Sequence, residues 1–279
     1  MKTILKKQTV LLLALMLGGF QLTHAKEAVI EVMPKGSETK ADTSGAKSAK
    51  ETWEKLAGRM AKRPEFAYVE NNPALPNVLI YGDSISIGYT QYVRKKLGTE
   101  ANLYRLHKNG SYSDVFIPAM KEMHDAMTDG KLDKPWKFQW DVIQFNVGMH
   151  DLTMIKPDGK DSEPASRTSI EQYKKNLRDI LAYLEELAPD AKLIFATTTP
   201  VPEGAFKPRR IAGDAEKYNQ AALEVLADHP EVIINDLFTL TKPNQSKWWS
   251  EPGNVHYKKV GSNAQGEHVA KIILDTLGK

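Results

Sequence analysis

The residue whose position best suits chemistry is Ser84, in the turn Gly82-Asp83-Ser84. The turn follows the apolar run Val78–Tyr81, which predicts a buried strand, and precedes a helical pattern that starts near Gly88. A serine at a strand-to-helix turn has its hydroxyl lifted out of the sheet, and the helix N-terminus offers a positive dipole to a developing anion. These properties suit a nucleophile. A simple helix cap uses the same residue types, so capping remains the alternative.

A serine nucleophile needs a general base, and His256 is the best-placed histidine among the seven in the chain. It lies in the loop Gly253–Tyr257, before the last predicted helix, where it would return over the edge of the sheet. Three other histidines lie within or at the end of predicted helices and fit structural roles better: His124, His229 and His268.

The elements that must position these residues alternate between strand and helix from residue 77 onward. Five apolar segments predict strands at Asn77–Tyr81, Asn102–Leu106, Asp141–Val147, Ala191–Thr197 and Val232–Asn235. Helical patterns are predicted at Glu51–Arg63, Gly88–Leu97, Ser169–Leu187, Asp214–Ala227 and within Tyr257–Leu277. A further helix is predicted after Ser113 and ends near Met127. This alternation indicates an α/β fold with a doubly wound parallel sheet, for which we expect the flavodoxin-like strand order 2-1-3-4-5.

In such folds a site forms beyond the carboxyl ends of the strands. Four of those ends carry polar residues or glycine directly after an apolar run: Gly82–Ser84, Asn109–Gly110, Gly148–Asp151 and Thr197–Pro202. We therefore expect these segments to meet.

These segments resemble, in their order, the four motif blocks of the SGNH (GDSL) hydrolase family: Gly82-Asp-Ser84, Gly110, Gly148-x-His150-Asp151 and Val255-His256. The resemblance covers roughly residues 75 to 277. It is closest to an exported bacterial branch with Gly-x-His-Asp in place of Gly-x-Asn-Asp, on the segments Asp141–Asp151, Thr197–Pro202 and Asn254–Tyr257. The resemblance implies a three-layer α/β/α fold and ester hydrolysis at a serine.

The resemblance also implies roles for individual residues. Ser84 would be the nucleophile, and its own amide would be one donor of the oxyanion hole, with the Gly110 amide as the second. His256 would be the base and then the acid for the leaving group. The family's third donor is usually an asparagine, and His150 occupies that position. An imidazole N–H can donate as well, and a protonated ring would add charge, so we expect His150 to be a donor, with a structural histidine as the alternative.

The family's catalytic acid usually stands three residues before the histidine, where this chain has Gly253. Two alternatives follow. Either a Ser–His dyad operates, with a carbonyl or water orienting the imidazole, or another carboxylate serves. Glu251 is the nearest candidate, whereas Asp151 and Asp83 could instead hold loops by hydrogen bonds. Partial catalysis survives the loss of a third triad member.

Further candidates concern substrate binding. Arg209 and Arg210 could hold an acidic group by bidentate hydrogen bonds, or form an ordinary solvated pair. Trp248 and Trp249 could stack on a sugar ring, or pack their loop. Two polar residues beside the motifs complete the candidate set: Asp83 and Asn109. No phosphate loop or His-Glu-x-x-His motif is present, so we expect neither a metal nor a cofactor.

The N-terminus predicts a secretory signal peptide over residues 1–25, with three lysines, the apolar run Val10–Phe20 and the cleavage signal Thr23–Ala25. Residues 26–50 predict a flexible linker, because so polar a stretch cannot bury enough apolar surface to fold. Residues 51–279 form a single predicted hydrolase domain.

The amino-acid composition argues against several kinds of protein. The chain has no cysteine, so it forms no disulfide and carries no lipidated N-terminal cysteine. Three of its 38 basic side chains belong to the leader, which leaves 35 against 35 acidic ones. This balance gives no support to nucleic-acid binding.

Together these observations predict an exported serine esterase, in the periplasm or outside the cell, that removes an ester from carbohydrate, most simply an O-acetyl group. The alternatives are a lipid or aryl esterase, a sulfate-ester hydrolase, and a non-catalytic carbohydrate-binding protein on the same fold. We expect no stable membrane insertion after leader cleavage. The sequence leaves the oligomeric state open.

Overall fold

The structure, a computed structural model, describes residues 46–157, 162–205 and 207–279. The predicted signal peptide and most of the predicted linker lie outside the described residues. The last residues of that linker are folded, however. Lys47 donates its N–H to the Lys131 carbonyl at 2.9 Å, and Ser48 caps α1 (Ala49–Ala57) through a 3.2 Å bond from the Glu51 N–H. Because Ala49 is buried, the folded region begins before residue 51.

The predicted helix Glu51–Arg63 is correct only in its first part. The α-helix ends at Ala57, because Gly58 adopts a φ of +55°, a conformation that glycine accepts without strain. Two short 3₁₀ helices follow, η1 (Gly58–Lys62) and η2 (Pro64–Phe66).

The centre of the fold is a five-stranded sheet made of β1 (Asn77–Tyr81), β2 (Asn102–Arg105), β3 (Val142–Phe145), β6 (Lys192–Ala196) and β7 (Ile233–Asn235). The strand order is β2-β1-β3-β6-β7, and every neighbouring pair is parallel. This is the predicted order 2-1-3-4-5. A small antiparallel pair, β4 (Met154–Ile155) with β5 (Ala165–Ser166), was not predicted and lies within the charged loop after β3.

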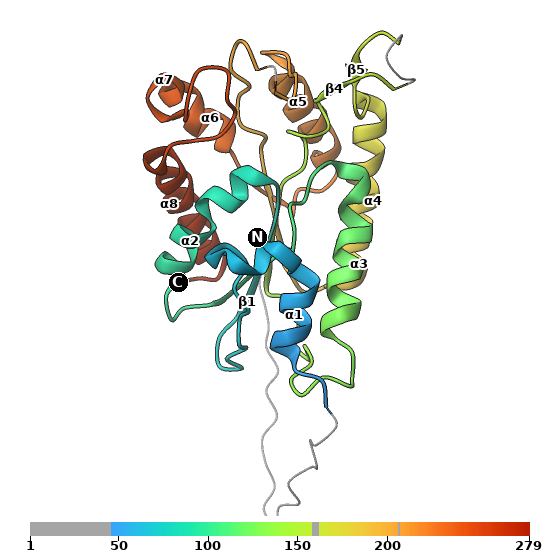
Figure 1. The fold of residues 1–279 in the computed structure, drawn as a ribbon, viewed down its shortest axis with the longest axis vertical. Coiled ribbons are helices and arrows are strands. Elements are labelled where there is room, and N and C mark those ends of the chain that lie inside the picture. The colour runs from blue at the N-terminus through green and yellow to red at the C-terminus, as the bar shows by residue number, and fades with distance from the viewer. Residues whose placement is uncertain (1–45, 158–161, 206) are drawn as a thin grey trace, which may run out of the picture. The chain divides into compact units, whose positions relative to one another are not determined.

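Helices cover both faces of this sheet, which confirms the three-layer α/β/α fold (Figure 1). One layer contains α2 (Ser84–Leu97) and α8 (Lys259–Thr276), which pack along each other, with α6 (Leu237–Thr241) beside them. The other contains α1, α3 (Phe116–Met127), α4 (Ile170–Leu187) and α5 (Asp214–Leu226). Three further short helices lie in the described part of the chain: η3 (Ser113–Val115), η4 (Lys242–Asn244) and α7 (Gln245–Trp248).

The strands divide the core by the alternation of their side chains. In β1, Leu79 and Tyr81 pack with the α3–α4–α5 layer, whereas Val78 and Ile80 pack with the α2–α8 layer. All of these side chains are fully buried. The uninterrupted apolar run of β1 therefore has a physical reason, because both faces of the strand are covered.

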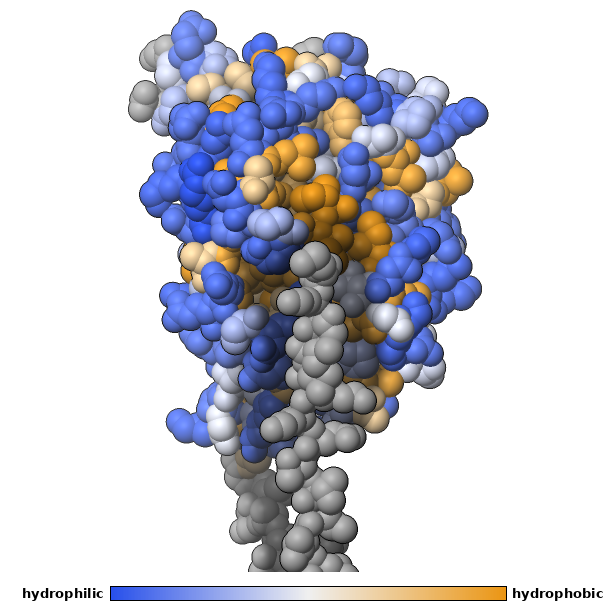
Figure 2. All heavy atoms as spheres, turned by 180° about the vertical axis from the view of Figure 1, so that it is seen from behind, coloured by the Kyte–Doolittle hydropathy of each residue, from blue (hydrophilic) through white to orange (hydrophobic). Residues whose placement is uncertain are grey.

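No helix among the described residues is long and apolar enough to cross a membrane. The face opposite to the view of Figure 1 is mostly hydrophilic, with apolar side chains gathered near its middle (Figure 2). The exposed large hydrophobic side chains of the described residues are Ile211, Leu223, Ile234 and Val260.

Candidate active site

The turn that carries Ser84 is capped by its neighbour. Asp83 is the N-cap of α2, and its Oδ1 accepts the Ile85 N–H at 2.8 Å. The helix therefore begins at Ser84, four residues before the predicted start at Gly88. Since Asp83 does the capping, the Ser84 hydroxyl remains available, and its Oγ lies 2.8 Å from Nε2 of His256. The arrangement meets the geometric requirement for a nucleophile and its base.

A buried arginine that the sequence analysis did not single out fixes this turn. Arg105, at the end of β2, is 1 % exposed and donates to the Gly82 carbonyl at 3.4 Å. It also donates to Ser86 Oγ at 3.3 Å and Thr90 Oγ1 at 2.7 Å. Burial lowers the pKa of the Arg105 guanidinium to about 10, which leaves it charged at neutral pH. The only feature of the sequence that could have pointed to Arg105 is a charged residue at the end of an apolar strand.

The base is oriented by Asn254, which the sequence analysis also missed. Nδ1 of His256 lies 2.7 Å from Oδ1 of Asn254, and the His256 backbone N–H donates to the same oxygen at 2.9 Å. Because this oxygen can only accept, Nδ1 carries the hydrogen and Nε2 is left to accept the Ser84 proton. Of the two alternatives, the structure matches the dyad with an orienting carbonyl, and a side chain supplies that carbonyl.

Glu251 is linked to His256 only through Asn254. Its Oε1 accepts a hydrogen bond from Nδ2 of Asn254 at 2.9 Å. This bond fixes which end of the Asn254 amide faces His256. No hydrogen bond or ion pair joins Glu251 to the imidazole among the described residues, so Glu251 supports the base through Asn254.

The backbone conformation requires a glycine at position 253, where an acid was expected. Its φ is +73°, and an added Cβ would lie 2.5 Å from the Gly204 carbonyl oxygen. Any side chain at this position would collide with the backbone of a neighbouring loop. A carboxylate is therefore sterically excluded at position 253.

Asp151, the second candidate acid, holds loops instead. It is fully buried, and its carboxylate accepts the Ser113 N–H at 3.0 Å and the Ser113 hydroxyl at 2.5 Å. Burial raises the pKa of Asp151, and the hydrogen bonds from Ser113 oppose that rise. Its backbone carbonyl also accepts the Thr168 N–H at 3.1 Å. It thus ties the segment after β3 to the segment after β2, and the interpretation as an acid beside His256 is wrong.

The Gly110 amide is occupied in this structure. It donates to the Gly82 carbonyl at 3.0 Å, and the Gly110 carbonyl accepts the Tyr81 hydroxyl at 2.8 Å. An added Cβ would lie 2.6 Å from the Tyr81 ring, so glycine is required for close packing against the end of β1. The predicted role as a free oxyanion donor does not agree with this geometry. Asn109 shapes the same turn, because its Oδ1 accepts the Ser111 N–H at 2.9 Å.

Two donors remain for an oxyanion. The Ser84 amide lies in the first turn of α2, where backbone N–H groups have no acceptor within the helix. His150 lines a cavity of about 360 Å³ together with Ser84 and His256. Burial lowers the pKa of His150, so the ring is neutral at neutral pH and can donate through one N–H without adding a charge.

Arg210 supplies a buried positive charge in this cavity. It is 7 % exposed, lines the same space, and donates from Nε to the Met149 carbonyl at 2.9 Å. Burial lowers the pKa of Arg210, and the nearby Asp83 opposes that effect. Arg209 is exposed instead, and its backbone carbonyl accepts the Met154 N–H at 2.9 Å. The two arginines are therefore not an ordinary solvated pair.

Trp248 and Trp249 also differ in their surroundings. Trp248 packs against α8, where a Cβ added to Gly261 would lie 2.7 Å from the Trp248 Cβ. Trp249 lines a separate, larger cavity beside the His256 loop. Within the described parts of the chain, no group of three or more His, Asp or Glu residues could hold a metal ion.

A parallel α/β/α sheet with a hydrogen-bonded Ser–His pair at its carboxyl edge is the arrangement that a serine-dependent hydrolase requires. A model of the GDSL-like lipase/acylhydrolase family matches residues 80–264, which is more than half of the chain. The chain therefore belongs to this family, and it is a carboxylic ester hydrolase by class. No protein with a curated description matches the sequence.

Solved structures with low sequence identity share the fold. A Bacteroides fragilis protein suggested to be an acylhydrolase is 15% identical, with a TM-score of 0.54 over 79% of this chain and 98% of that one. The acetyl xylan esterase AlAXEase is 16% identical, with a TM-score of 0.52 over 71% and 99%. A carbohydrate esterase family 2 enzyme from Corynascus thermopiles is 16% identical, with a TM-score of 0.50 over 76% and 69%.

Proposed function

We propose that this protein is an exported serine esterase that removes an acyl group, most simply acetyl, from a carbohydrate. Ser84 is the nucleophile and His256 the base. The observation that carries the proposal is the 2.8 Å contact between Ser84 Oγ and His256 Nε2, together with the 2.7 Å contact that orients the other ring nitrogen. The predicted leader supports the exported location.

The reaction follows from these contacts in two halves. His256 Nε2 takes the Ser84 proton as Oγ bonds to the acyl carbon, and the carbonyl oxygen becomes an oxyanion. The Ser84 amide and His150 donate to that oxygen, and the charge of Arg210 lowers its energy. His256 then returns the proton to the departing sugar oxygen. In the second half a water gives its proton to His256 and attacks the acyl carbon, which releases acetic acid and restores the Ser84 hydroxyl.

Three observations support a carbohydrate ester. Most side chains that line the cavity at Ser84 are polar or charged, and its apolar ones are only two prolines and a valine, which suits a sugar better than the acyl chain of a lipid. Among the described residues, the exposed large hydrophobic side chains come from separate segments of the chain and not from one apolar helix or loop that could act as a lipase lid. Two of the proteins that share the fold are carbohydrate esterases by name.

The test compares the wild type with Ser84→Ala. Acetate release from p-nitrophenyl acetate and from O-acetylated xylo-, gluco- and mannohexaose is measured at neutral pH. Wild type is expected to release acetate, and Ser84→Ala to lose about 10³-fold or more in kcat. Folded wild-type protein with no Ser84-dependent release from any of these esters would refute the proposal.

A further inference from the structure

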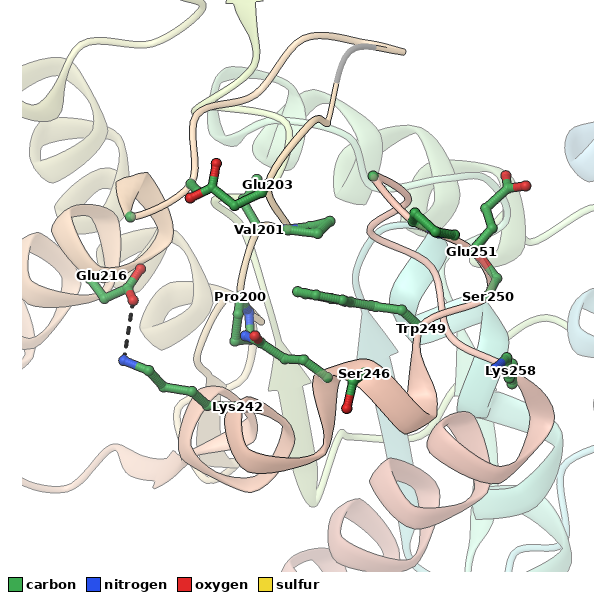
Figure 3. A pocket seen from close by; sticks show the side chains of 16 residues that line it. Pro200, Val201, Glu203, Glu216, Lys242, Ser246, Trp249, Ser250, Glu251 and Lys258 are labelled. Atoms are coloured by element: carbon green, nitrogen blue, oxygen red, sulfur yellow. Dashed lines mark hydrogen bonds and ion pairs between the residues drawn. The ribbon is translucent and has the colours of Figure 1, made fainter.

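A cavity larger than the catalytic one lies on the other side of the His256 loop (Figure 3). Its volume is about 860 Å³, against about 360 Å³ for the cavity at Ser84. One wall is the segment 200–203 after β6, and another is the segment 249–253 that leads to His256. The start of α5 and Lys242 of η4 close the remaining sides. Of the side chains that line it, only that of Glu251 takes part in the hydrogen bonds of the site described above, as the partner of Asn254.

Trp249 occupies the middle of the cavity. Figure 3 shows its ring reaching from the end of α7 toward Pro200 and Val201. The ring is half-buried, and with Pro200, Val201 and Pro202 it forms the apolar part of a wall that also carries polar and charged side chains. A flat aromatic surface of this kind packs well against the C–H face of a sugar ring.

The polar part of the wall suits hydroxyl groups. Glu203, Glu216 and Glu251 provide acceptors, and Lys242 and Lys258 provide donors. Lys242 and Glu216 pair with each other at 3.3 Å, as the dashed line in Figure 3 marks. The opposite charges nearly balance, so the cavity favours neutral sugars over acidic ones.

The cavity adjoins the catalytic site through shared residues. The segment Glu251–Gly253 lines both spaces, and the close approach of Gly253 to Gly204 separates them. A sugar chain that crosses this contact would have one unit on Trp249 and another at Ser84.

We propose that the cavity around Trp249 is a subsite for neutral, non-acetylated sugar units of the same chain whose ester reacts at Ser84. The inference rests on the proposed function and adds to it an oligosaccharide substrate that extends beyond the reacting unit. The subsite supplies binding energy that a small ester cannot use.

The test is the ratio of kcat/KM on O-acetylated xylo-, gluco- or mannohexaose to kcat/KM on p-nitrophenyl acetate. In Trp249→Ala we expect this ratio to fall about 10-fold for the best hexasaccharide, mainly through KM, because an aromatic contact contributes about 1.5 kcal/mol. Trp249→Phe keeps an aromatic face and is expected to recover part of the ratio. Lys247→Ala, an exposed change in α7 two residues before Trp249, is the matched control and is expected to leave the ratio unchanged.

A ratio that is unaltered in Trp249→Ala, with the hexasaccharide still hydrolysed in a Ser84-dependent way, overturns the subsite and leaves the proposed function intact. Loss of both activities to the same degree, with no recovery in Trp249→Phe, also overturns it, because that pattern indicates a structural role for the ring. Ser84-dependent hydrolysis of p-nitrophenyl acetate alone, with no hexasaccharide hydrolysed, overturns the subsite and the carbohydrate substrate together.

Discussion

The Ser84 turn and the His256 loop meet at one hydrogen bond, yet the protein positions them in opposite ways. The turn is buried and is held by the end of β1, by Asp83 and by the Arg105 guanidinium. The loop is exposed and is held by a short row of side-chain bonds from Glu251 to Asn254 to His256. The nucleophile thus depends on the folded core, whereas the base depends on a few polar contacts at the surface. Changes in the two regions should therefore affect stability and catalysis to different degrees.

The largest expected effect is in the core region. Arg105→Met would leave the hydroxyl oxygens of Thr90 and Ser86 without a donor, and each such buried group costs about 1–3 kcal/mol. The Gly82 carbonyl would keep only the Gly110 N–H. We expect the free energy of unfolding to fall by about 3–5 kcal/mol, measured by urea denaturation, with lower esterase activity in the fraction that remains folded. Stability equal to wild type would show that Arg105 does not hold the turn.

A pH effect on stability comes from the same region. His107, buried two residues after β2, has a pKa lowered to about 4 by burial. The unfolded chain binds this proton near pH 6.5, so the stabilisation is complete above that pH and is lost as the pH falls toward 4. The loss from this group reaches about 3 kcal/mol. His107→Gln should flatten the dependence of unfolding free energy on pH between 7 and 4, and an unchanged slope would contradict this assignment.

In the loop region, the largest effect is expected in Asn254→Ala. The variant removes the acceptor of the His256 Nδ1–H, a contact that contributes about 1.5–3 kcal/mol, so kcat should fall about 10- to 100-fold. The unfolding free energy should change little, because the loop is exposed. Asn254→Asp keeps an acceptor and should retain more activity than the alanine variant. Wild-type kcat in Asn254→Ala would remove this residue from the mechanism.

The smallest effect is expected in Glu251→Gln. The amide oxygen of glutamine can still accept the Asn254 Nδ2–H, and Glu251 does not contact the imidazole. We expect kcat on p-nitrophenyl acetate to stay within about 3-fold of wild type, since a hydrogen bond is replaced rather than lost. A drop as large as that of Asn254→Ala would mean that the carboxylate charge itself supports the base.

The contrast between the buried Ser84 turn and the exposed His256 loop also explains which features the sequence could predict. The strands, their order and the pairing of Ser84 with His256 follow from apolar runs and from the geometry of parallel sheets, which the sequence records directly. Asn254 was missed because the direction of its side chain depends on the backbone path through Gly253, whose positive φ and close approach to Gly204 arise only in the folded chain. Arg105 was missed because its partners are mostly backbone and hydroxyl oxygens brought together only by folding.

The Gly110 amide illustrates the same limit. A motif position identifies the glycine, but only the backbone path shows that its N–H faces the Gly82 carbonyl. The start of α2 was misplaced for a local reason, because the capping carboxylate of Asp83, and not the apolar periodicity, decides where the helix begins.

The contact between Gly253 and Gly204 also constrains how this enzyme can change in evolution or design. A conventional triad cannot be restored by a single substitution at position 253, because the new Cβ would meet the Gly204 carbonyl at 2.5 Å. An aspartate there becomes tolerable only after the loop that contains Gly204 has moved away. The two positions are therefore expected to vary together, and a designer who wants a carboxylate behind His256 would have to remodel both loops in one step.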